Sequence, residues 1–273
     1  MSIQKILLIV FMLIAGMTNA QAVTYYLTET DLGGTVYIVD TETGTYVTRD
    51  VSPQENPGAI AITGNRIVMA NYDDDGSWEY DLDLNPTGNS WPGSNTWSQM
   101  LDGTTDGVHN YAVSWSSNGV IECDLNFENC SLLFNPGFSV IGITYDPTND
   151  SFWVVNDDAL TVHNFTRAGS EITSWVADFD ERNCCLAYDS QSDTLWMSTN
   201  GGSTIWNLNK TGVVLDSVTL SGLQAQNTWG AEISLLGGTG LSSVSVPAMG
   251  GHGLALLMLA LALAAFVVLR RHY

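Results

Sequence analysis

The stretches Tyr145–Trp153 (YDPTNDSFW) and Tyr188–Trp196 (YDSQSDTLW) are near copies of one another, at an offset of 43 residues. The likeness continues without a gap over Ile143–Ser174 and Leu186–Ser217. Each copy contains four short segments rich in apolar and β-branched residues, and turns rich in Asp, Asn, Ser and Gly separate them. Such segments joined by short turns predict an antiparallel sheet of four strands in each copy.

Fainter copies of this unit precede and follow the pair, so that five starts fall near residues 59, 102, 141, 184 and 230. Val23–Val51 supplies three strands without a first one, and Trp229–Leu235 supplies a first strand that nothing follows. A period of about 40–45 residues with four strands is the signature of a β-propeller. The sequence therefore predicts an all-β propeller of five blades over residues 23–236, closed by the C-terminal strand joining the N-terminal blade. A β-sandwich is the alternative fold.

On these repeats, Val23–Leu235 resembles small bacterial propellers of the broad WD-repeat, NHL and five-bladed lectin kind. The resemblance implies a ring of blades whose specificity depends on its loops, and no signature with a fixed chemistry accompanies it. In such a ring, Trp153 and Trp196 are expected to pack between neighbouring blades.

The N-terminal segment Met1–Ala22 has one lysine, an apolar run and then the small-residue site Ala20-Gln21-Ala22. That order is typical of a secretory signal peptide cleaved after an A-x-A site. The alternative is an N-terminal membrane helix, for which the apolar part is short.

At the other end, Leu254–Leu269 is apolar without a charge, and a Gly- and Ser-rich linker precedes it at residues 237–245. With its glycine-rich lead-in, this run is just long enough to span a bilayer. Basic residues flanking a span stay on the cytoplasmic side, so the propeller is predicted to lie outside the cytoplasm. The alternative is a buried core helix.

The segment 246–273 resembles the bacterial sorting tag in which a short Pro-containing motif precedes a membrane helix and a basic tail. Val246, Pro247 and Gly253 match the motif, and Arg270 and Arg271 form the tail, whereas three other motif positions differ. The resemblance implies an exosortase-type transpeptidase as a partner, with release from the membrane or attachment to the cell surface after processing. A plain single-pass anchor is the alternative.

The part of the chain between the two ends is strongly acidic. All 29 acidic residues and only five of the eight basic ones lie there, which gives a formal charge of −24. Such a surface repels nucleic acid and anionic lipid, so neither is an expected partner.

All four cysteines lie in the exported part, where an oxidising compartment favours disulfides. Cys123 and Cys130 flank a predicted hairpin turn and are the obvious pair. Cys184 and Cys185 are then left with each other as a vicinal disulfide. Links from either of them to Cys123 or Cys130, or two free buried thiols, stay open.

Asn71, Asp73, Asp75 and Glu79 follow the pattern N-x-D-x-D-G-x-x-E. Oxygens at alternate positions of a loop bent at glycine can surround a cation, and this pattern resembles the calcium loops inserted in integrin-type propellers. The resemblance implies calcium as a cofactor. The alternative is an acidic hairpin turn.

The segment Asn85–Gln99 is rich in Gly, Pro, Asn and Ser, which predicts a surface loop. Trp91 and Trp97 lie in it, and exposed aromatic rings stack on sugar faces. Both are therefore candidate ligand-binding residues. The alternative is that both rings fold back and pack beside the acidic hairpin.

Support for catalysis is weak, because neither outer-domain histidine has a metal-binding spacing and no nucleophile motif is present. Acidic pairs such as Asp157 and Asp158, or Asp178 and Asp180, are expected by chance among so many acids. We therefore predict an exported binding protein for a glycan or another protein. The alternatives are a polysaccharide hydrolase or lyase that uses carboxylates in the funnel, and a structural surface protein.

Overall fold

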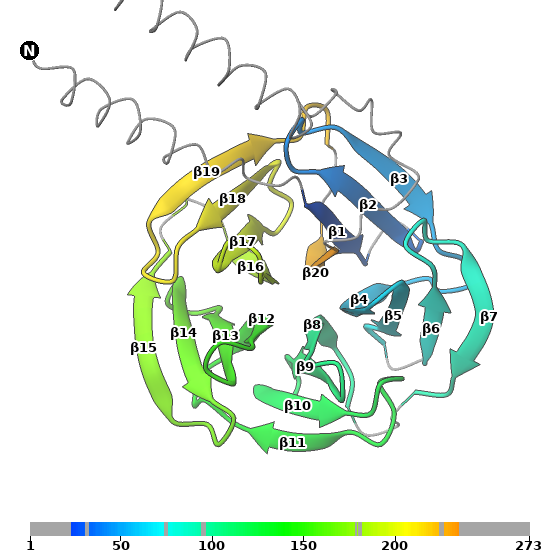
Figure 1. Cartoon of the computed structure of the whole chain (residues 1–273). Coiled ribbons are helices and arrows are strands. Elements are labelled where there is room, and N and C mark those ends of the chain that lie inside the picture. Colours follow the sequence, from blue (N-terminus) through cyan, green and yellow to red (C-terminus); the bar gives the residue numbers. More distant parts are fainter. Residues whose placement is uncertain are drawn as a thin grey trace, which may run out of the picture. The chain divides into compact units, whose positions relative to one another are not determined.

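The computed structural model describes residues 23–30, 33–73, 76–93, 97–177, 179, 182–223 and 227–234. Their strands form five antiparallel sheets of four strands, arranged as blades around a common centre (Figure 1). The predicted five-bladed β-propeller is confirmed, and the β-sandwich is wrong. No helix long enough and apolar enough to cross a membrane occurs among the described residues. The predicted signal peptide, linker, membrane helix and sorting tag lie outside them.

The strands of each blade follow one another from the centre of the ring outward. Blade I contains β20 (Thr228–Ser234), β1 (Thr24–Glu29), β2 (Thr35–Asp40) and β3 (Tyr46–Asp50). Blade II contains β4 (Pro57–Thr63), β5 (Arg66–Asn71), β6 (Ser77–Tyr80) and β7 (Pro86–Trp91). Blade III contains β8 (Met100–Thr105), β9 (Asn110–Ser114), β10 (Gly119–Cys123) and β11 (Ser131–Phe134). Blade IV contains β12 (Val140–Asp146), β13 (Ser151–Asn156), β14 (Thr161–Thr166) and β15 (Glu171–Val176). Blade V contains β16 (Asn183–Asp189), β17 (Thr194–Thr199), β18 (Thr204–Leu208) and β19 (Val214–Thr219).

Ring closure joins the two ends of the propeller in blade I. The last strand, β20, pairs antiparallel with β1, from Thr24 opposite Ser234 to Glu29 opposite Thr228. This confirms that the segment beginning at Trp229 is the first strand of the N-terminal blade. The innermost strand of each blade is still an edge of its own sheet, but the closed ring surrounds these five short edges with neighbouring blades and so protects them.

Burial changes with position in the blade. Every residue of β16 and β20 is buried, whereas five of the six residues of the outermost strand β7 are exposed. The prediction of a surface loop over Asn85–Gln99 is correct about its exposure but wrong about part of its structure. Pro86–Trp91 form a strand whose polar composition suits an outer edge, where Pro is tolerated as the first residue.

The apolar core lies between neighbouring blades and forms three clusters of buried side chains. Tyr26 and Ile60 belong to the cluster shared by blades I and II, and Ala61 and Ile121 to that shared by blades II and III. Trp153 and Trp196 are both buried in the largest cluster, as their repeated position predicted. Packing sheet against sheet around the ring therefore fixes the directions of the five innermost strands.

Candidate ligand site at the axis of the ring

One buried carboxylate ties four of the five blades together at the axis. Asp102 Oδ1 accepts hydrogen bonds from the backbone N–H groups of Gly103 (3.0 Å) and Ala231 (2.8 Å). Its Oδ2 accepts from the N–H groups of Ile143 and Leu186, both at 2.9 Å. The four donors lie on β8, β20, β12 and β16, so a single side chain holds the innermost strands in register.

The innermost strands approach one another closely beside two of these donors. A Cβ atom on Gly142 would lie 1.7 Å from the Cys184 carbonyl oxygen of β16, and one on Gly230 would lie 2.1 Å from the Gly58 carbonyl oxygen of β4. Asp102 itself is completely buried. Burial raises the pKa of its carboxyl group, and the nearby Glu232 adds to this, while the N–H donors act in the opposite direction.

A cavity of about 250 Å³ lies where the innermost strands end, and all five blades contribute to its wall. Its lining is rich in hydroxyl groups and also includes two carboxyl groups and two tyrosine rings. The lining residues are Ile62, Thr104, Thr105, Asp106, Thr144, Tyr145, Pro147, Tyr188, Ser190, Glu232 and Ile233.

Glu232, on β20, supplies a carboxyl group that is neutral near pH 7. Burial raises its pKa to about 8, although hydrogen bonds from the Ile233 N–H and the Thr104 hydroxyl oppose the shift. The Thr104 hydroxyl donates to Glu232 Oε2 at 3.0 Å. A neutral carboxyl group can donate a hydrogen bond as well as accept one, which a carboxylate cannot do.

Thr144, on β12, contributes a hydroxyl group that lacks a partner. Its side chain is completely buried, and its Oγ1 makes no hydrogen bond in the part of the chain that the structure describes. A buried hydroxyl group without a partner costs about 1–3 kcal/mol. Because Thr144 is completely buried, a ligand or water in the adjacent cavity would remove this cost only where the wall moves to uncover Oγ1.

Asp106, the second carboxyl group of the lining, is fully engaged by the protein. Its Oδ1 accepts from the N–H groups of Val108 and His109, and its Oδ2 from the Tyr111 hydroxyl (2.7 Å) and Arg167 (2.9 Å). Although burial acts to raise it, these donors hold the pKa of Asp106 at about 2. Asp106 is thus an ionised wall residue without a free oxygen for a ligand proton.

Tyr145 and Tyr188 place aromatic rings on the wall, and each ring is held by its own blade. The Tyr145 hydroxyl donates to Asp150 (3.0 Å), and the Tyr188 hydroxyl donates to Asp193 (2.6 Å). Lys210 Nζ lies 5.1 Å from the centroid of the Tyr188 ring. Fixed rings beside hydroxyl groups are well suited to a small polyhydroxylated ligand.

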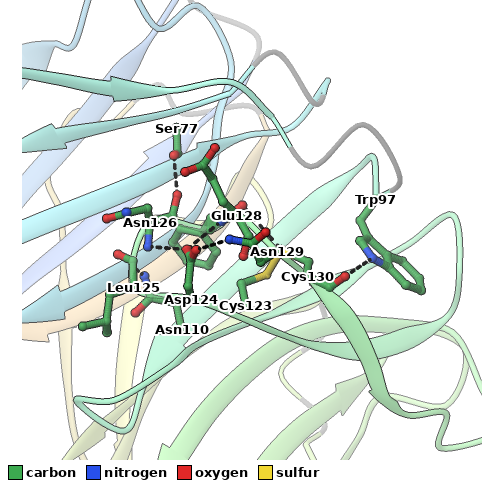
Figure 2. Close-up of a disulfide and its surroundings, with 11 residues drawn as sticks. Ser77, Trp97, Asn110, Cys123, Asp124, Leu125, Asn126, Glu128, Asn129 and Cys130 are labelled. Carbon is green, nitrogen blue, oxygen red and sulfur yellow. Dashed lines mark hydrogen bonds between the residues drawn. A yellow bond between two sulfur atoms is a disulfide. The ribbon is translucent and has the colours of Figure 1, made fainter.

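The structure places Trp91 and Trp97 away from this cavity, where both are partly buried against the core shared by blades II and III. The Trp97 indole N–H donates to the Cys130 carbonyl oxygen at 3.2 Å, and the Arg66 guanidinium lies 5.3 Å from the centroid of the Trp91 ring (Figure 2 shows Trp97). These contacts agree with the packing alternative. Sugar binding by the two rings stays a prediction.

The predicted calcium loop is described in part, because Asp75 lies outside the described residues. Asn71 Oδ1 accepts from the Asn56 N–H at 3.1 Å, and Asp73 accepts from the Asn56 amide at 2.6 Å. Glu79 pairs with Arg66 and accepts further hydrogen bonds. Among the described residues, no three His, Cys, Asp or Glu side chains gather in a group that could hold a metal ion. Calcium binding stays a prediction, and a melting temperature unchanged by chelation would contradict it.

The disulfide between Cys123 and Cys130 is confirmed, and links from either residue to Cys184 or Cys185 are thereby ruled out (Figure 2). It closes the turn between β10 and β11. Figure 2 shows how this turn contacts the neighbouring blade, where the Ser77 hydroxyl donates to the Asn126 carbonyl oxygen. Cys184 and Cys185 are buried thiols at the start of the innermost strand β16. The tag residues Val246, Pro247, Gly253, Arg270 and Arg271 lie outside the described residues.

Sequence reasoning missed Asp102, Thr144 and Glu232 as site residues. The available signal was a polar or charged residue inside a short, otherwise small and apolar first strand of a blade, as in LDG and AEI. The acidic pairs that were considered instead are not in the cavity lining: Asp157 pairs with Arg182, and Asp178 and Asp180 lie outside the described residues.

No protein-family model matches this chain, and no curated protein matches it. A chain in the crystal structure of a nidogen/laminin complex superposes with a TM-score of 0.54 at 11% identity, covering 78% of this chain and 98% of that one. A glutaminyl cyclase from Myxococcus xanthus superposes with a TM-score of 0.48 at 10% identity, covering 61% of this chain and 72% of that one. A protein of unknown function from Bacteroides caccae gives a TM-score of 0.48 at 12% identity, with coverages of 74% and 76%. At 11% identity, the likeness to the chain in the nidogen/laminin complex shows the fold alone.

Proposed function

We propose that this protein is an exported binding protein, held at the cell envelope by its C-terminal segment, whose axial cavity receives one sugar residue or a group of similar size and polarity. The observation that carries the proposal is the unpartnered hydroxyl group of Thr144 in the wall of that cavity. A sugar hydroxyl would satisfy it once the wall moves to uncover Oγ1. Glu232 would supply a neutral carboxyl group and Tyr145 and Tyr188 the aromatic faces that sugar rings pack against.

The size of the cavity limits the ligand. Pockets for drug-sized molecules measure about 300–1,000 Å³, and this cavity measures about 250 Å³. It therefore suits a monosaccharide or the terminal residue of a longer glycan, while the rest of the chain would extend into solvent.

Export and anchoring rest on the sequence at the two ends. The leader pattern of Met1–Ala22 and the Cys123–Cys130 disulfide both fit an oxidising compartment outside the cytoplasm. The apolar run Leu254–Leu269 with its basic tail supports attachment to the membrane, and the sorting-tag resemblance supports processing by a transpeptidase. The acidic propeller would repel the phosphates of nucleic acid, so nucleic acid is not among the proposed partners.

Glycan hydrolysis is a second candidate, because Glu232 is protonated near pH 7 and lines the cavity like a general acid. The reaction needs a second carboxylate as nucleophile or base. Asp106 is the only other carboxyl group among the described lining residues, and its two oxygens already accept four hydrogen bonds. The geometry therefore favours binding without turnover.

The test is to apply the full-length exported chain, purified in detergent with calcium present, to an array of bacterial and algal polysaccharides and to monosaccharides. Thr144→Val removes the unpartnered hydroxyl at nearly constant shape. It is expected to weaken binding about tenfold, the worth of one hydrogen bond, without lowering the melting temperature. Thr63→Val is the matched control, because Thr63 ends the innermost strand β4 but is not in the cavity lining.

Three outcomes would contradict parts of the proposal. If changing Trp91 and Trp97 to Ala abolishes glycan binding while Thr144→Val binds as the unchanged chain does, the glycan site lies at those two rings and not in the axial cavity. Absence of binding to any glycan would favour a protein partner or a structural role. Release of shortened glycan, abolished in Glu232→Gln, would establish hydrolysis.

A further inference from the structure

The two cysteines at the start of β16 lie unusually close together. Their Sγ atoms are 2.7 Å apart, and both side chains are completely buried. A disulfide bond is about 2.0 Å long, and two sulfur atoms without a bond normally rest much farther apart than 2.7 Å. We propose that Cys184 and Cys185 form a vicinal disulfide in the exported protein.

The backbone of β16 explains how consecutive side chains can meet. In a regular strand, neighbouring side chains point to opposite faces of the sheet. The pairing of β16 with β17 shifts register between Asn183 and Cys185, which marks a bulge at this point. A bulge re-aims a side chain, and here it brings the second sulfur beside the first.

The same irregularity occurs in blade IV, where the pairing of β12 with β13 shifts between Val140 and Gly142. The repeat places Ile141 and Gly142 there instead of two cysteines. The bulge is therefore a property of the repeated blade, and the thiol pair is an addition to blade V.

The surroundings of the pair determine when the bond can form. Cys184 Sγ lies 3.2 Å from the Thr228 carbonyl oxygen on β20, so the pair lies against the ring-closing strand. Burial raises the pKa of the Cys185 thiol, and the contact with Cys184 and the nearby Asp102 add to the effect. The reactive species in thiol–disulfide exchange is the thiolate. Oxidation is therefore expected before β16 and β20 pack together.

The reaction is a two-electron oxidation by a protein or small-molecule disulfide of the oxidising compartment. One cysteine thiolate attacks that disulfide, forms a mixed disulfide and releases one thiolate of the oxidant. The other cysteine thiolate then attacks the mixed disulfide, which forms the Sγ–Sγ bond and releases the second thiolate. The oxidant leaves as two thiols that take up the two protons. The Cys123–Cys130 disulfide needs the same compartment, so the proposal does not depend on the ligand of the axial cavity.

Mass spectrometry of the full-length exported chain tests this directly. The protein is unfolded without reductant in the presence of an alkylating maleimide and then digested with trypsin. Cleavage after lysine and arginine places the two pairs on separate peptides, Ile67–Arg167 and Asn183–Lys210. Asn183–Lys210 is expected to carry no alkyl group and to be lighter by two hydrogen atoms, and to gain two alkyl groups when reductant precedes alkylation.

Two alkyl groups on Asn183–Lys210 without reductant would overturn the proposal, and so would a link from this peptide to Ile67–Arg167 or to a second copy of itself. The Cys123→Ser and Cys130→Ser double variant is the matched control, and Asn183–Lys210 is expected to behave in it as in the unchanged chain. Mass is the better readout than stability, because the entropy gained by closing so small a loop is slight.

Discussion

Blades IV and V contain the nearest copies of the repeated sequence, yet the same aspartate has different partners in each. In blade IV, Asp146 is completely buried, accepts from the Trp153 indole N–H at 3.2 Å and pairs with Lys210 at 2.8 Å. In blade V, the equivalent Asp189 accepts from the Gln191 N–H and from the backbone and hydroxyl of Ser192, all on its own turn. Both aspartates also accept a hydrogen bond from the backbone N–H two residues further on, of Thr148 and of Gln191. The repeat thus preserves the residue and this turn, but not the ion pair or the indole contact.

The difference between the two aspartates arises from the following blade. Asp146 of blade IV receives its cation, Lys210, from blade V. Lys210 on the turn between β18 and β19 lies two residues before Gly212, whose backbone adopts φ +81° against Trp175 of blade IV. Blade I has the equivalent Gly44, at φ +69° against Val218 of blade V. The residue two positions before it is Glu42, an acid. The junction between blades V and I consequently lacks this ion pair among the described residues and relies on strand pairing and apolar packing.

The largest effect on stability is expected from removing the charge of Asp146, and removing that of Asp189 should cost less. Asp146→Asn leaves Lys210 without its buried partner and should lower the free energy of unfolding by about 2 kcal/mol. The cost is smaller than for a fully buried ion pair because Lys210 also pairs with Asp193. Asp189→Asn should cost about 0.5–1 kcal/mol. Urea titrations of both variants measure the difference, and equal costs would contradict the comparison.

The contribution of Asp146 should also depend on pH. Burial acts to raise its pKa, but Lys210, Thr148 and Trp153 hold it below the ordinary value of 3.8. The folded protein therefore keeps the carboxylate charged at a pH where the unfolded chain already binds a proton. The stabilisation is complete above about pH 4 and is lost as pH falls through the lower, folded-state pKa. The gap in stability between the unchanged chain and Asp146→Asn should shrink in acid unfolding experiments, and a gap that is constant down to pH 2 would exclude this origin.

A smaller difference is expected between the two repeated tryptophans. The Trp153 indole N–H donates to Asp146, whereas Trp196 Nε1 is buried without a hydrogen-bond partner in the described part of the chain. Both Trp→Phe changes lose packing volume, but only Trp153→Phe also loses a hydrogen bond to a charged acceptor. Trp153→Phe should therefore cost about 1–2 kcal/mol more than Trp196→Phe in thermal or urea unfolding. A larger cost for Trp196→Phe would show that the indole N–H has no part in the difference.

The smallest effect on stability is expected from placing a lysine at the junction between blades V and I, where the equivalent of Lys210 is an acid. Glu42→Lys exchanges an exposed acid for a base at the position equivalent to Lys210, and exposed ion pairs contribute about 0.2–1 kcal/mol. A gain of about 0.5 kcal/mol that disappears in Glu42→Lys combined with Asp189→Asn would identify Asp189 as the partner. A gain that persists in the double variant would instead reflect the lower overall negative charge.

The blade count and the closing strand could be predicted from the sequence, because the repeat period and the orphan strand at Trp229 are properties of the chain itself. The strand at Pro86–Trp91 was missed, since an outer edge strand needs no apolar face and its polar residues look like a loop. The cavity could not be predicted in the same way. Thr144 and Glu232 are 88 positions apart in the chain and meet in its wall only after the ring has closed.

The pairing of Thr24 with Ser234 means that the chain enters and leaves the folded ring at adjacent points of one blade. A mechanical load applied to the chain beyond Ser234 would act first on β20, at the end where its pairing with β1 can be peeled apart one residue at a time. That strand carries Glu232 and the N–H group of Ala231 that binds Asp102. Tension on the C-terminal side would therefore reach the axial cavity before it reached the outer strands of any blade.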